Sequence, residues 1–172
     1  MVFFPGWTKQ ISHKKKVRII ALLTLFIPVQ MFVIGDFYGQ GFQTPLFRYM
    51  DTMFGSFIVL VSRDIWSVMT GFATGVNALI LILWAIALAI LLVNVVFLFI
   101  GRKDFALKMI TGGKLVMVSG IFFLSSIVLQ YGPLFHNQMG ISIPIGLPLL
   151  VLIGLWMYSE GVKIKKSGPS GD

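Results

Sequence analysis

The sequence lacks cysteine and is poor in histidine and in acidic residues, and each shortage excludes a class of chemistry. Without cysteine there is no disulfide bond, cysteine-ligated zinc, iron–sulfur cluster or thiol nucleophile. The two histidines, His13 and His136, have no neighbouring ligands, so the sequence indicates no metal site. All six acidic residues lie outside the long apolar runs or at their rims, which argues against a buried proton or ion relay.

Apolar residues, in contrast, are abundant. Hydrophobic residues make up 57% of the chain and charged residues 12%, about half of the ~25% that is usual in soluble domains. A soluble domain of 172 residues could not bury so much apolar surface, so we expect lipid to be part of the solvent. The pattern predicts an all-α integral membrane fold, a four-transmembrane-helix bundle. Its spans are expected at 19–35, 76–100, 109–131 and 141–159.

The first of these runs has features that a regular span would not need. Pro28 and Gln30 interrupt it near its middle, and a proline there predicts a kink. A secretory signal peptide is the alternative, because a basic stretch precedes the run. The run is longer than a signal core of about 7–15 residues, and no Ala-x-Ala-like cleavage site follows it. We therefore interpret it as the first transmembrane helix.

The remaining segments connect the spans. They are a basic segment at 1–18, a first extracytoplasmic loop at 36–75, an inner loop at 101–108, an outer turn at 132–140 and a tail at 160–172. The long loop contains two short candidate elements, at 45–50 and 57–61, with a turn at 51–56 between them. A small β-hairpin is the first interpretation of this loop, and an amphipathic interfacial helix is the second.

The basic residues indicate how the chain is oriented. Twelve of the fourteen lysines and arginines fall on one side of the predicted spans. The positive-inside rule then places both termini and the 101–108 loop in the cytoplasm, next to anionic lipid headgroups. Nucleic acid is not expected as a partner, because the basic residues flank apolar runs and form no face with interleaved aromatics. We expect a multi-pass protein in the cell membrane of a bacterium or archaeon.

Three groups of residues are candidate functional positions. Small residues on the third span let helix backbones approach closely, and the helix-packing candidates are Gly112, Gly113 and Gly120. Charges of the long loop form either a partner surface or ion pairs that hold the loop together: Arg48, Asp51, Arg63 and Asp64. Polar groups within or next to the spans either line a path or bond between helices: Gln30, Asn77 and Asn94.

The order of segments resembles the tetraspan layout of claudin-like proteins. It has an inner N-terminus, a long first outer loop with strand-like content, a short inner loop, a short outer turn and an inner tail. Claudins carry a tryptophan and paired cysteines in the first outer loop. Here Trp66 lies in the loop but the cysteines are absent, so the resemblance is one of topology over nearly the whole chain.

These observations predict a non-enzymatic tetraspan membrane protein that acts through lateral assembly and its outer loop. It would be a structural, interaction or accessory subunit, with a membrane protein or further copies of itself as partner. The alternative is a subunit of a small membrane transporter or channel. An enzyme acting on lipid or quinone is less favoured, because no paired acid and base, nucleophile or metal group is recognisable. No cofactor is expected.

Overall fold

The computed structural model describes residues 12–35, 39–100, 104–138 and 140–166. Most of the predicted basic segment at 1–18, three residues of the 101–108 loop and the last six residues of the tail lie outside this range. The described chain forms five helices and a six-stranded antiparallel sheet. The prediction of an all-α four-helix bundle is therefore wrong.

The first apolar run, predicted as a transmembrane helix at 19–35, is divided between a helix and a strand. Helix α1 (His13–Leu23) has only 11 residues, and β1 (Gln30–Ile34) follows it. Pro28 lies between the two, and its ring and missing N–H oppose continuation of the helix. The next residue joins the sheet region, because the Val29 N–H donates to the Gln43 carbonyl at 2.8 Å. The apolar composition is as expected, but the periodicity changes from that of a helix to that of a strand.

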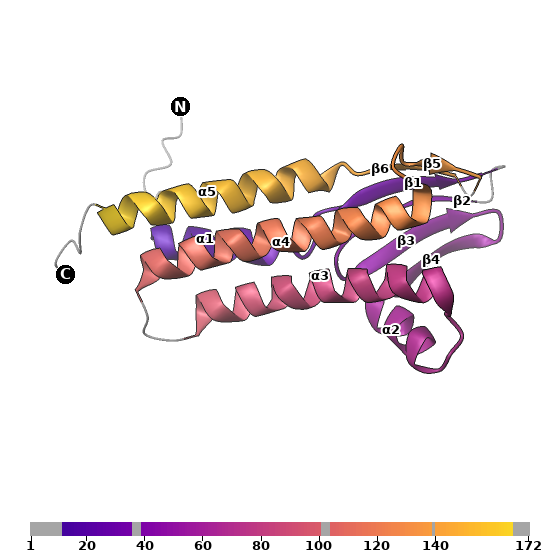
Figure 1. Cartoon of the computed structure of the whole chain (residues 1–172), viewed down its shortest axis with the longest axis horizontal. Coiled ribbons are helices and arrows are strands. Elements are labelled where there is room, and N and C mark those ends of the chain that lie inside the picture. Colours follow the sequence, from indigo (N-terminus) through magenta and orange to yellow (C-terminus); the bar gives the residue numbers. More distant parts are fainter. Residues whose placement is uncertain (1–11, 36–38, 101–103, 139, 167–172) are drawn as a thin grey trace, which may run out of the picture.

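Three helices of the described chain are long and apolar enough to cross a membrane. They are α3 (Gly75–Phe99), α4 (Phe105–Tyr131) and α5 (Gly146–Lys166). They overlap the second, third and fourth apolar runs, although the start of the fourth run, predicted as a span at 141–159, forms β6 and its helix begins only at Gly146. The three helices pack side by side (Figure 1). By length and composition the chain is consistent with a membrane protein.

The sheet lies at one end of these helices (Figure 1). Its strand order is β4-β3-β2-β1-β6-β5, with every neighbouring pair antiparallel. The other strands are β2 (Gly39–Gln43), β3 (Phe47–Thr52), β4 (Gly55–Leu60), β5 (His136–Asn137) and β6 (Gly140–Ile143). The hairpin expected in the long loop is present as β3 and β4, but it is one part of this larger sheet. A short helix, α2 (Val61–Met69), follows directly, so the loop contains both strands and a helix.

The opposite end of the helices is basic. Here α1 begins and α3 and α5 end (Figure 1). Two cations bond carbonyls at the C-terminal end of α3: the Arg18 Nε donates to the Leu98 carbonyl at 3.1 Å, and the Lys108 Nζ donates to the Ile100 carbonyl at 2.7 Å. Positive charge is favourable at a helix C-terminus, where carbonyls lack intrahelical partners.

The predicted packing glycines of α4 have different surroundings. A Cβ at Gly113 would come within 2.5 Å of the Gly154 carbonyl oxygen, so this residue marks a close approach of α4 to α5. A Cβ at Gly112 would meet the Asn94 side chain of α3 at 2.6 Å. A Cβ at Gly120 would meet no described neighbour within 4 Å. Close packing therefore needs glycine at the first two positions.

Gly113→Ala is expected to reduce stability by about 1–3 kcal/mol, because backbone atoms of α5 must move to admit the methyl group. The free energy of unfolding in mixed micelles, followed by tryptophan fluorescence, would measure this. Gly120→Ala is the matched control on the same helix. It should be neutral or stabilising by up to about 1 kcal/mol, since alanine is the better helix former. Equal losses for both variants would contradict the assignment.

Candidate interaction surface

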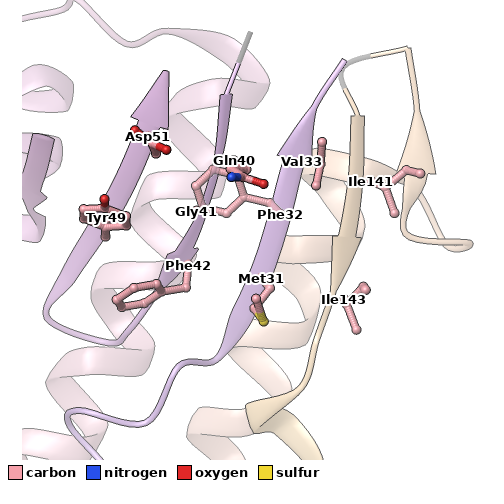
Figure 2. Close-up of a pocket in the computed structure, with 10 residues that line it drawn as sticks. All are labelled: Met31, Phe32, Val33, Gln40, Gly41, Phe42, Tyr49, Asp51, Ile141 and Ile143. Atoms are coloured by element: carbon pink, nitrogen blue, oxygen red, sulfur yellow. The ribbon is translucent and has the colours of Figure 1, made fainter. Parts of the chain in front are cut away.

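One face of the sheet is open, and we call it the front face (Figure 2). Cross-strand partners form two rows on it. The apolar row consists of Ile143, Met31, Phe42, Tyr49 and Ile58. The second row, which we call the outer row, lies two residues further along each strand from the turn at 44–47. It consists of Ile141, Val33, Gln40, Asp51 and Ser56.

The front face is hollowed over its central strands. The hollow has a volume of about 470 Å³ and contains members of both rows (Figure 2). The rings of Phe42 and Tyr49 stack across β2 and β3, with centroids 5.4 Å apart and planes at 28°. Met31 and Ile143 are 49% and 58% exposed. Large apolar side chains thus cover the middle of a face that no other described element covers.

The back face of the sheet carries buried polar groups instead. The Gln30 Nε2 donates to the Gln43 Oε1 at 2.9 Å, and the Ser142 Oγ donates to the Gln30 Oε1 at 2.7 Å. All three side chains are at most 3% exposed. Because a buried amide without a partner is costly, these bonds fix β1, β2 and β6 in a single register.

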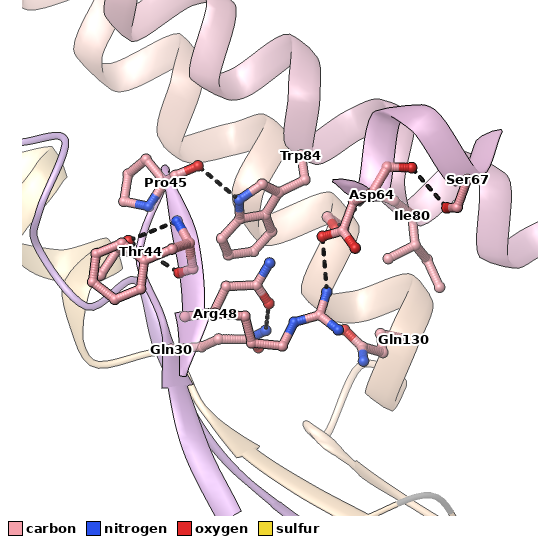
Figure 3. Close-up of polar contacts among 12 residues, drawn as sticks. Gln30, Thr44, Pro45, Arg48, Asp64, Ser67, Ile80, Trp84 and Gln130 are labelled. Carbon is pink, nitrogen blue, oxygen red and sulfur yellow. Dashed lines mark hydrogen bonds and ion pairs between the residues drawn. The ribbon is translucent and has the colours of Figure 1, made fainter. Parts of the chain in front are cut away.

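Two further contacts attach the sheet and α2 to their neighbours (Figure 3). The Trp84 Nε1 of α3 donates to the Pro45 carbonyl at 3.3 Å, in the turn between β2 and β3. Arg48 of β3 forms an ion pair with Asp64 of α2, with Nη2 and Oδ2 3.4 Å apart. Burial raises the pKa of the Asp64 carboxyl, and the nearby Arg48 and Arg63 offset this only in part.

The β4 strand forms one edge of the sheet and has no partner on its outer side among the described residues. Its last four residues, at 57–60, are all large and apolar, without charge or proline. Natural edge strands are usually protected by charges, prolines or bulges. The turn before β4 exposes Met53 and Phe54, the latter at 88%. The edge is therefore long, apolar and unprotected.

The apolar surface continues from β4 onto α2 and the residues that follow it. Trp66, Met69 and Phe72 are all exposed. On the side facing α3, Ile65, Met69 and Ala85 line part of an apolar groove with a volume of about 290 Å³. Helix α2 thus has an exposed apolar side next to the outer half of a candidate span.

No protein-family model, curated protein or solved structure matches this chain. Any assignment of function therefore depends on the surface just described. The described residues also include no group of three or more His, Asp or Glu side chains placed to hold a metal ion.

The four loop charges predicted from the sequence do not form one surface. Arg48 and Asp64 pair with each other on the side of the sheet that faces the helices. Asp51 lies on the front face and accepts a hydrogen bond from the Ser56 Oγ at 2.6 Å. Arg63 is exposed on α2. The Arg48–Asp64 pair corresponds to the structural interpretation of these charges, although neither residue is paired with its near neighbour in sequence.

The three predicted path residues also lie apart. Gln30 belongs to the buried cluster behind the sheet, and Asn77 is exposed in the first turn of α3. Asn94 is fully buried, and neither its Oδ1 nor its Nδ2 has a hydrogen-bond partner among the described residues. The structure does not bring these three side chains to a common path.

Sequence reasoning missed Trp84, Gln43 and Ser142 as residues that position the sheet. Trp84 lies within a continuous apolar run, where an indole N–H in search of a partner leaves no pattern. Gln43 and Ser142 are polar residues in separate loops, and only the pairing of β1 with both β2 and β6 brings them together. A polar residue within or next to an apolar run was the available signal, and for Gln30 it was interpreted as a group within the first predicted transmembrane helix and not as part of a sheet.

Asp64→Asn is expected to change how stability depends on pH. The folded protein holds the Asp64 proton more tightly than the unfolded chain, whose pKa is about 3.8. The contribution of the Asp64 carboxyl to the free energy of unfolding is therefore fully present below the unfolded pKa, and it is lost as the pH rises through the raised folded pKa. The free energy of unfolding of the wild type should therefore fall relative to that of Asp64→Asn as the pH rises through this window.

Unfolding in mixed micelles at a series of pH values from about 3 upward would measure that difference. Asp51→Asn is the control, because it removes a carboxylate from the front face and leaves Asp64 in place. A wild-type advantage over Asp64→Asn that grew as the pH rose would show that the ion pair with Arg48 outweighs burial, and would contradict the prediction.

Proposed function

We propose that this chain is a non-enzymatic membrane protein that acts by assembly with another protein through the β4 edge of its sheet. The helices α3, α4 and α5 would anchor it in a cell membrane. The basic end, with residues such as Arg18, Lys108 and Lys163, would face the cytoplasm, and the sheet would lie on the outer side. The observation that carries the proposal is the open, apolar and unprotected edge of β4.

The register of the hairpin indicates which backbone groups of β4 are available. The Val61 N–H donates to the Leu46 carbonyl, and the pairs of β3 and β4 continue the same register. In an antiparallel ladder, hydrogen-bonded pairs alternate with pairs whose N–H and C=O groups point away. The backbone N–H and C=O groups of Ser56 and Ile58, and the N–H of Leu60, therefore point to the open edge, where an added strand would bond them.

The rest of the structure supports this use of the edge. The bonds among Gln30, Gln43 and Ser142 hold the central strands, and the Arg48–Asp64 pair attaches β3 to α2. A strand that is already held in place loses little conformational freedom when a partner pairs with it, so more of the interaction energy appears as affinity. The exposed Met53 and Phe54 would add apolar contacts next to the new strand.

Ile58→Pro tests the proposal directly. Proline removes an N–H that points to the open edge and places a ring there, while the bonds between β3 and β4 use other residues. We expect the stoichiometric partner that copurifies from native membranes, identified by mass spectrometry, to decrease by about tenfold or more. Ile58→Val is the matched control, because it retains the N–H and the branched side chain, and it should retain the partner.

Both variants must first show the circular dichroism spectrum and monodisperse elution of the wild type. Retention of the partner by folded Ile58→Pro would rule out the edge as the interface. A wild-type protein that purifies as a lone monomer would count against the assembly function itself.

A second candidate, a subunit of a small transporter or channel, is favoured by one observation. The buried Asn94 amide is unpaired among the described residues, and a polar group in such a position commonly serves a pathway or a bound water. If water reaches it, Asn94→Cys should react with a membrane-impermeant thiol reagent, in a protein that has no other cysteine. Absence of labelling in folded protein would remove this candidate.

A further inference from the structure

On the side of the apolar row nearer the turn at 44–47, the sheet is inside out compared with the sheet of a water-soluble protein. The back-face side chains there are polar, with Gln30, Gln43 and Arg48 paired across β1, β2 and β3, whereas the back-face positions on the other side of the row, such as Phe32 and Met50, are apolar. The front-face neighbours of the three polar residues, such as Met31 and Phe42, are apolar. Polar side chains inside and apolar side chains outside are the arrangement of a sheet whose outer face meets lipid.

The depth of this row can be measured along α3. Arg18 bonds the Leu98 carbonyl at the basic end, and Trp84, fourteen residues earlier, bonds the Pro45 carbonyl in the turn below the sheet. Fourteen residues of helix span about 21 Å. Tyr49 in the apolar row is two strand residues beyond Phe47, which adds about 7 Å at most. The row therefore lies near the outer boundary of a hydrocarbon core of about 30 Å that begins at Leu98.

The outer row lies about 7 Å further out, which is beyond the same boundary. It is at this row that polar side chains first occur on the front face, as Gln40, Asp51 and Ser56. On β2, β3 and β4 the change from apolar to polar side chains thus falls near the depth at which the hydrocarbon core should end, whereas Val33 and Ile141 in the same row remain apolar. A second copy of the chain covering the face would give no reason for this coincidence.

The apolar row is also continuous with the surface of a candidate span. Ile143 is separated from the first residue of α5, Gly146, by only two residues. Further along that helix, Leu149 and Leu152 are exposed on a surface that would meet lipid. The exposed apolar side of α5 and the apolar row are therefore neighbouring parts of one surface.

We propose that the apolar row of the front face is immersed in the outer leaflet and contacts lipid acyl chains, while the outer row lies among the headgroups. The sheet then rests partly within the membrane. This inference depends on the membrane insertion proposed above. Because Ile58 of β4 belongs to the same row, the open β4 edge at that depth would need a protein partner or water.

Single cysteines can test this cleanly, because the chain has none of its own. Met31→Cys and Val33→Cys form a matched pair: both are on β1, on the same face, and about half exposed. Each would carry a nitroxide label in the full-length protein, reconstituted in vesicles of phosphatidylcholine and phosphatidylglycerol. Collision rates with oxygen, which concentrates in hydrocarbon, and with a water-soluble nickel chelate would then be compared.

The ratio of oxygen to nickel collisions should be about threefold or more higher at position 31 than at position 33, since the two lie on opposite sides of the hydrocarbon boundary. Ile143→Cys and Ile141→Cys should repeat this difference on β6. High nickel collision rates at both positions 31 and 33 would place the whole face in water and overturn the inference, and low rates at both would show that the hydrocarbon boundary does not lie between the two rows. Labels at 31 that meet neither reagent and show spin–spin broadening would assign the face to a second copy and also overturn it.

Two reference positions separate this result from a failure of membrane insertion. A label at Val93, an exposed residue in the C-terminal third of α3 and five residues inside Leu98, should be accessible to oxygen, and a label at Phe54 should be accessible to nickel. If the label at Val93 met water, the insertion would be wrong. If the label at Val93 met lipid but the label at Met31 did not, only the immersion of the sheet would be wrong.

Discussion

The pairing of β1 with strands from two distant parts of the chain is the constraint on which the rest of the structure depends. Beyond Pro28 the chain can no longer continue as the α1 helix, and its backbone groups need other partners. β2 supplies them on one side and β6 on the other. The N-terminal segment, the long loop and the turn before α5 thereby become one sheet, placed at the end of three long apolar helices.

That arrangement requires polar groups to be buried behind the sheet. Gln30, Gln43 and Ser142 lie where the sheet meets the helices, and each is hydrogen-bonded within the group. The bonds among them make the register specific, because a shift of one residue would move every side chain to the opposite face. The same alternation places Met31 and Phe42 on the front face. The buried polar cluster and the exposed apolar row are thus two results of one register.

The proposed assembly through the sheet edge and the proposed immersion of the apolar row both involve β4. Lipid cannot hydrogen-bond to an open strand edge, and exposed edges do not occur within the hydrocarbon region. If the apolar row lies just inside the outer leaflet, the lower part of β4, near Ile58 and Leu60, lies close to that boundary. Its outward N–H and C=O groups would then need a protein partner, because lipid cannot bond them. A strand edge that lies in water above the membrane has less need of a partner, because water can bond it.

The sequence by itself determined the general character of the protein: an apolar chain without cysteine, with three long runs that become helices and basic residues gathered at one end. Composition and run length carry this information because lipid and charge act on each segment separately. They also indicated the β3–β4 hairpin, whose partners are neighbours in the chain. Only the tertiary structure decided that the run at 19–35 is divided, that Arg48 pairs with Asp64, and that β4 is left as the open edge. Each of these depends on partners far along the chain, and a local pattern cannot contain them.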